Sequence, residues 1–89
     1  MKDRKELLEF LREFCKNLLD LNDEVVNSIS EETILNKDLQ MDELDLVEMQ
    51  FAIERKFDVK IDIMAFGLFT ISDWRVKDVI DEFFKARRN

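Results

Sequence analysis

The sequence contains no proline, tyrosine or histidine and only one glycine in 89 residues. Tight β-hairpin turns need glycine and proline more often than this, so the composition argues against a β-rich fold. Without histidine, a zinc site or a histidine-activated nucleophile is difficult to build. The spacing of Asp38, Asp42 and Asp45 lacks the one-residue alternation and central glycine of a calcium loop. We therefore expect neither an enzyme nor a metal site.

Cysteine and long apolar runs are equally scarce. A lone Cys15 excludes an internal disulfide, and its place on an apolar helical stripe predicts a buried, unreactive thiol. No apolar run approaches the roughly 18 residues that a membrane-spanning helix needs. The charged start of the chain does not resemble a secretory signal. We expect a soluble, cytoplasmic protein that makes no membrane contact.

Negative charge is the dominant feature of what the sequence does contain. Twenty-one acidic residues oppose 14 basic ones, which gives a formal net charge of -7. Such a balance argues against nucleic-acid binding and favours a partner with a basic docking surface. A chain of 89 residues is long enough for one hydrophobic core. We expect a single domain spanning residues 1–89 that exists as a monomer.

The spacing of apolar residues predicts an all-α fold with four helices. Apolar residues recur three and four positions apart in three long stretches. The predicted main helices cover about residues 2–21, 42–57 and 74–87, and a short third helix covers about 62–67. The stretch 22–41 is expected to form a long connection with one short helical turn. Residues 59–63 alternate like a strand but have no partner strand, so they predict an extended linker.

The second main helix is expected to begin at Asp42, a favourable N-cap residue. Glu43 and Asp45 then lie in its first turn, where the helix dipole favours negative charge. The predicted apolar positions of this helix are Leu44, Val47, Phe51, Ile53 and Phe57. Glu48 and Glu54 are expected on a more polar face.

The run DELDLVEMQFAIERKFDVKI at 42–61 resembles the second helix and following loop of acyl carrier proteins. The segment 74–81 resembles the opening of the last helix in that family. In acyl carrier proteins an Asp-Ser-Leu triplet opens the second helix, and its serine carries 4'-phosphopantetheine. The resemblance implies a four-helix carrier fold that docks to enzymes of fatty acid, polyketide or related acyl and peptidyl assembly.

This chain departs from the family pattern at its defining position. The triplet reads Asp42-Glu43-Leu44, so the phosphopantetheine cofactor expected of the family cannot be attached at Glu43, and we expect no cofactor. Two interpretations of Glu43 stay open: an ordinary first-turn glutamate, or a charge that imitates the phosphodiester. Gln40 and Asp58 replace family glycines, which predicts a backbone less free to take left-handed conformations. Arg55 stands where the family is usually acidic.

Acyl carrier proteins dock through the acidic face of the second helix against lysine and arginine residues of their enzymes. The docking positions that the resemblance implies here are Asp42, Glu43, Leu44, Asp45, Glu48, Phe51 and Glu54. Alternatively, these charges are only a solvated helix face. A second alternative is a non-carrier interaction or regulatory module derived from the carrier fold. Arg55 should weaken docking to a uniformly basic surface, or select a partner with a carboxylate opposite it.

Overall fold

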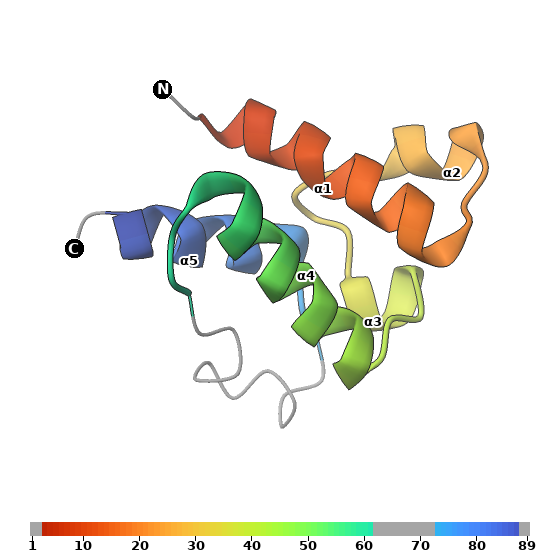
Figure 1. Cartoon of the computed structure of the whole chain (residues 1–89). Helices are drawn as coiled ribbons and strands as arrows, with labels where there is room; N and C mark the ends of the chain where they lie inside the picture. The colour runs from red at the N-terminus through yellow and green to blue at the C-terminus, as the bar shows by residue number, and fades with distance from the viewer. Residues whose placement is uncertain (1–2, 62–72, 88–89) are drawn as a thin grey trace.

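The computed structural model describes residues 3–61 and 73–87, and within these ranges the chain folds into α-helices joined by short connections (Figure 1). The helices are α1 (Arg4–Leu19), α2 (Asp23–Ser28), α3 (Leu35–Asp38), α4 (Glu43–Phe57) and α5 (Val76–Arg87). Helix α1 packs against α2, α4 and α5. The prediction of an all-α fold is confirmed.

The three main helices lie within two residues of their predicted boundaries. Asp3 caps α1 by accepting a hydrogen bond from the Glu6 amide, and Asp20 ends it in a left-handed conformation. Trp74 and Arg75, predicted to be helical, instead precede α5, and Arg75 forms an isolated antiparallel bridge with Ile34. The connection 22–41 contains two short helices rather than one helical turn. The helix predicted at 62–67 lies outside the described residues.

One hydrophobic core joins α1, α3, α4 and α5 with residues of the connections between helices, whereas α2 contributes no buried residue. The fully buried side chains with the largest volumes are Phe83, Leu7, Leu11, Ile29, Leu35, Leu46, Met49, Ile53, Ile80 and Val76. Phe57 bridges this core to the surface: its ring makes edge-to-face contacts with Phe10 and Phe83, each at a centroid distance of 5.2 Å. Each fully buried side chain of this size contributes about 1.5–3 kcal/mol.

Backbone hydrogen bonds attach the start of α5 to the connection before α3. The Leu35 amide donates to the Trp74 carbonyl at 2.6 Å, and the Val76 amide donates to the Thr33 carbonyl at 3.0 Å. The Asn36 side chain accepts a further bond from the Trp74 amide at 3.0 Å. These bonds satisfy backbone groups that would otherwise be left unpaired near the core.

The predicted apolar positions of α4 lie on two different faces of the helix, and only one of these faces enters the core. Leu46, Met49 and Ile53 are buried, whereas Leu44 is 73% exposed and Phe51 is 54% exposed. Among the predicted apolar positions, Ile53 is therefore a core residue, whereas Leu44 and Phe51, which were also predicted docking contacts, face solvent. Helix α4 carries apolar residues on two faces, and local spacing cannot tell which face the rest of the protein covers.

Two left-handed residues flank α4. Gln40 has a φ of 56°, and Asp58, the C-cap of α4, has φ 54° and ψ 51°. We expected these replacements of glycine to disfavour left-handed backbone, but both residues adopt it. Gln40 precedes the helix by a few residues and Asp58 ends it, so the surrounding fold imposes these conformations despite their steric cost.

The orientation of α4 can be tested with two leucines that lie two residues apart. Leu46→Ala should lower the free energy of unfolding by about 2–5 kcal/mol, because it removes a fully buried side chain. Leu44→Ala should change it by less than about 0.5 kcal/mol, because Leu44 faces solvent. Urea denaturation followed by circular dichroism measures both values. Equal losses would show that α4 is rotated differently about its axis.

The left-handed backbone at Gln40 predicts a stabilising substitution. Gln40→Gly should raise the free energy of unfolding by about 0.5–1 kcal/mol, because glycine adopts positive φ without steric cost. The control is Glu13→Gly in the exposed middle of α1, which should lower stability by about 1 kcal/mol. Chemical denaturation of both variants gives the comparison. A destabilised Gln40→Gly would contradict the left-handed assignment.

Candidate functional site

A reciprocal capping box begins α4. The Asp45 amide donates to Oδ1 of Asp42 at 2.9 Å, and the Asp42 amide donates to Oδ2 of Asp45 at 3.1 Å. Both carboxylates thereby satisfy amides that the first helical turn leaves unpaired. Glu43, the first residue of the helix, is exposed between them. The start of α4 therefore holds the Asp42 and Asp45 carboxylates in fixed positions, with exposed Glu43 beside them, at the positive end of the helix dipole.

Four exposed or outward-facing residues form a narrow stripe along α4, which we call the outer face: Leu44, Glu48, Phe51 and Arg55. Successive residues of an α-helix are rotated by about 100° around the helix axis. Because these four residues are spaced four, three and four positions apart, they fall within an arc of about 60°. Within the part of the chain that the structure describes, Leu44 and Phe51 are the only large hydrophobic residues classed as exposed. An exposed apolar pair on one helix face is a typical mark of an interaction surface.

Charge divides α4 into two halves. Asp42, Glu43, Asp45 and Glu48 make the N-terminal half acidic, and the exposed cations Arg55 and Lys56 follow in the C-terminal half. This polarity complements the helix dipole, which favours anions at the start and cations at the end. A partner that covers the whole helix would meet both signs in a fixed order.

Glu54 has a structural role that the sequence did not reveal. Its Oε2 accepts a hydrogen bond from the Ile61 amide at 3.0 Å, and Gln50 Nε2 donates to the Ile61 carbonyl at 2.8 Å. The two side chains, one helical turn apart, hold the segment after α4 against the helix. Glu54 is half-buried and lies about 80° away from the outer face. The only feature of the sequence that could have indicated this role is the i,i+4 spacing of Gln50 and Glu54, a few residues before Ile61.

The seven predicted docking residues thus fall into different surroundings. Leu44, Glu48 and Phe51 lie together on the outer face. Asp42 and Asp45 cap the helix, and Glu54 is occupied by its bond to the backbone of Ile61. Glu43 is exposed in the first turn, beside the capping box.

Cys15 offers no nucleophile. It is buried on α1, as predicted, and is not part of a disulfide. Burial, assisted by the negative charge of Asp45, raises the pKa of its thiol from 9.0 to about 12. The thiolate that nucleophilic chemistry requires is therefore scarce at neutral pH.

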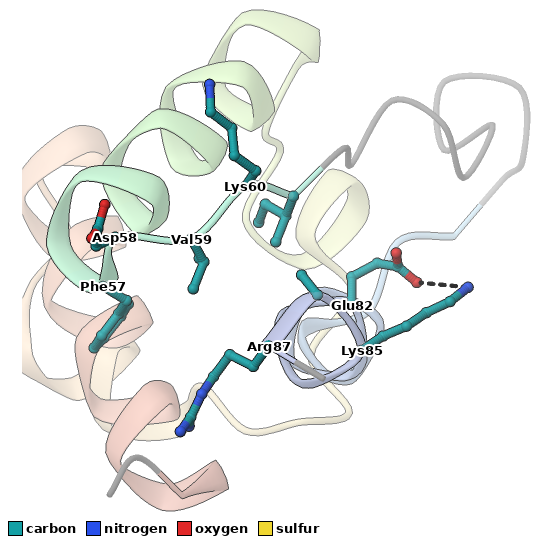
Figure 2. A pocket seen from close by; sticks show the side chains of 9 residues that line it. Phe57, Asp58, Val59, Lys60, Glu82, Lys85 and Arg87 are labelled. Carbon is teal, nitrogen blue, oxygen red and sulfur yellow. Dashed lines mark ion pairs between the residues drawn. The ribbon is translucent and has the colours of Figure 1, made fainter. Parts of the chain in front are cut away.

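A cavity of about 690 Å³ lies between the end of α4 and α5, and Figure 2 shows the side chains that line it. Its charged residues are Asp58, Lys60, Glu82, Lys85 and Arg87, and the Lys85 ammonium lies 4.0 Å from the Glu82 carboxylate. The Arg87 guanidinium lies 5.7 Å from the centre of the Phe83 ring. Charges of both signs surround the cavity, so its lining indicates no preference for an anionic or a cationic ligand.

A second hollow runs between α1 and α4, and we call it the α1/α4 groove. It measures about 510 Å³ and is lined by Phe10, Glu13, Phe14, Asn17, Ala52, Arg55 and Lys56. Phe10 and Phe14 are half-buried and form its apolar wall. Arg55 belongs both to this groove and to the outer face, so the two features are continuous.

Within residues 3–61 and 73–87, no group of three or more carboxylate, thiol or imidazole residues is placed to hold a metal ion. No helix in the same ranges has both the length and the apolar character that a membrane crossing requires.

No family model matches this chain, and comparison with curated proteins and with solved structures finds no similar protein. The outer face of α4 is the candidate site on the strength of its own geometry: apolar side chains exposed to solvent close to the capping carboxylates of Asp42 and Asp45.

The different roles of two glutamates on α4 can be separated by their effects on stability. Glu54→Ala should lower the free energy of unfolding by about 1–3 kcal/mol, because it leaves the Ile61 amide without its acceptor. Glu48→Ala should change it by less than about 0.5 kcal/mol, because Glu48 is exposed. Thermal and urea denaturation measure the difference. Indistinguishable variants would mean that Glu54 does not brace the segment after α4.

Proposed function

We propose that this chain is an acyl-carrier-like docking domain that binds basic surfaces of enzymes in fatty acid, polyketide or related acyl and peptidyl assembly. The observation that carries the proposal is the outer face of α4, where Leu44 and Phe51 remain exposed with Glu48 between them. An enzyme surface with apolar pockets on either side of a lysine or arginine would complement this face.

The energetics of the outer face suit a transient contact. Complete burial of Leu44 and Phe51 contributes about 1.5–3 kcal/mol for each side chain. The carboxylates of the first turn add long-range attraction toward a basic surface, which speeds encounter more than it tightens binding. A domain that visits several enzymes in succession needs fast association and fast release.

The backbone on both sides of α4 also supports the proposal. Gln40 and Asp58 stand where the resemblance places family glycines, and both adopt the left-handed conformation for which glycine is suited. The backbone before and after α4 thus has the left-handed conformation that glycine adopts most easily, although the residues at these two positions are not glycine.

Glu43 does not fit phosphopantetheine attachment. The cofactor is carried in the family as a phosphodiester of a serine hydroxyl, and the Glu43 side chain ends in a carboxylate that has no such hydroxyl. Glu43 is nevertheless exposed at the start of α4, where a serine would be accessible to a modifying enzyme. The proposed domain therefore docks without carrying an acyl group at this position.

Arg55 and Lys56 favour a second candidate function, a non-carrier interaction or regulatory module. Both cations are exposed on the C-terminal half of α4 and line the α1/α4 groove. They oppose contact with a uniformly basic surface. A module of this kind would keep the helical scaffold and bind one partner with matched charges of both signs.

Restoring the serine tests the carrier proposal. Glu43→Ser and the parent chain are each incubated with coenzyme A and a phosphopantetheinyl transferase of broad specificity, and intact-mass spectrometry follows the products. We expect one phosphopantetheine group on Glu43→Ser and none on the parent, because the scaffold around α4 still presents the site. No modification of either chain would contradict the carrier proposal and favour the interaction module.

The same assay tests whether the outer face guides docking. Adding Glu48→Lys to Glu43→Ser should slow modification about tenfold, because it reverses the charge between the exposed apolar residues. The matched control adds Glu24→Lys, the same charge change at an exposed position of α2, and should leave the rate unchanged. Equal rates for all three chains would show that the outer face takes no part.

A further inference from the structure

The outer face of α4 carries a charge pattern that is complementary to itself. Glu48 and Arg55 lie at equal distances, in opposite directions, from the midpoint between Phe51 and Ala52. Seven residues of helix separate them by roughly 10 Å, which is too far for an ion pair within one helix. Within the described residues neither side chain has an ion-pair partner. A second antiparallel copy of α4 would place an opposite charge against each of them.

We propose that two copies of this chain associate through α4 about a two-fold axis that passes between Phe51 and Ala52. The two α4 helices then run antiparallel, and Glu48 of each copy faces Arg55 of the other. A two-fold interface repeats every contact, so this arrangement forms two equivalent ion pairs. Ala52 lies near the axis, and its small side chain allows the helices to approach closely.

Phe51 supplies the aromatic part of this interface. Phe51 lies on the side of the outer face away from the α1/α4 groove. The two-fold rotation keeps it on that side, so Phe51 of one copy faces Phe51 of the other beside the axis. Edge-to-face contacts between such rings are worth about 0.5–1.5 kcal/mol beyond the area they bury. The two exposed phenylalanines thus cover each other across the axis.

The size and charge of the chain make this dimer weak. Only two large hydrophobic side chains among the described residues are exposed, whereas stable interfaces bury about 1,200–2,000 Å² in total. Two chains with a formal net charge of -7 also repel each other. We expect a dissociation constant on the order of 0.1–1 mM, so the chain is monomeric in dilute solution. Where it forms, the dimer covers the same face that the proposed enzyme partner would bind.

Charge reversal tests the interface without any enzyme. Sedimentation velocity measures association of the purified chain up to about 2 mM, which exceeds the expected dissociation constant. Glu48→Arg and Arg55→Glu should each weaken dimerisation at least about tenfold, because each places like charges together. The double variant E48R/R55E should restore it, because the ion pairs re-form with reversed sign. The controls Glu24→Arg and Lys5→Glu make the same charge changes at exposed positions on other helices.

The sign of the Glu48→Arg effect separates this proposal from simple charge repulsion. This variant moves the formal net charge from -7 to -5, so reduced repulsion alone would strengthen association. Weaker association of Glu48→Arg together with recovery in the double variant supports the two-fold interface. Stronger association of Glu48→Arg, no recovery in the double variant, or no association of the parent at about 2 mM would overturn it. Circular dichroism confirms that each variant is folded.

Discussion

Burial of Leu46, Met49 and Ile53 determines how α4 is rotated about its axis, and the surface chemistry of the protein depends on that rotation. These three side chains belong to the same core as α1 and α5. With them turned inward, Leu44 and Phe51 must face solvent, because they lie on the opposite side of the helix. The exposed pair is therefore a consequence of core packing, and it is the basis of the proposed docking face.

Local interactions at the two ends of α4 reinforce this arrangement. The Asp42 and Asp45 capping box defines where the helix begins, and left-handed Asp58 ends it. The bonds from Glu54 and Gln50 to the backbone of Ile61 then hold the following segment against the helix. Several carboxylates of an acidic helix thus have structural partners. Glu48, which is exposed and central to the outer face, is the carboxylate best placed to meet another molecule.

The sequence predicted the structural features that depend on the spacing of nearby residues, above all the positions of the main helices. The main helices were located to within two residues because apolar periodicity and capping residues act within a few positions. The buried face of α4 could not be predicted from the sequence, since both faces of this helix carry apolar residues and only tertiary contacts choose between them. The left-handed Gln40 and Asp58 were missed because neither is glycine. The docking residues came from a family resemblance, whereas the self-complementary stripe became apparent only once the rotation of α4 was known.

Docking to an enzyme and weak pairing with a second copy both require the same outward orientation of α4. The most direct measurement is solvent paramagnetic relaxation enhancement by a soluble gadolinium chelate, recorded for the leucine methyl groups by nuclear magnetic resonance at low protein concentration. The structure predicts strong enhancement for the methyl groups of Leu44 and little for those of Leu46. Similar enhancement at both residues, or stronger enhancement at Leu46, would contradict the orientation of α4 and remove the basis for the outer face.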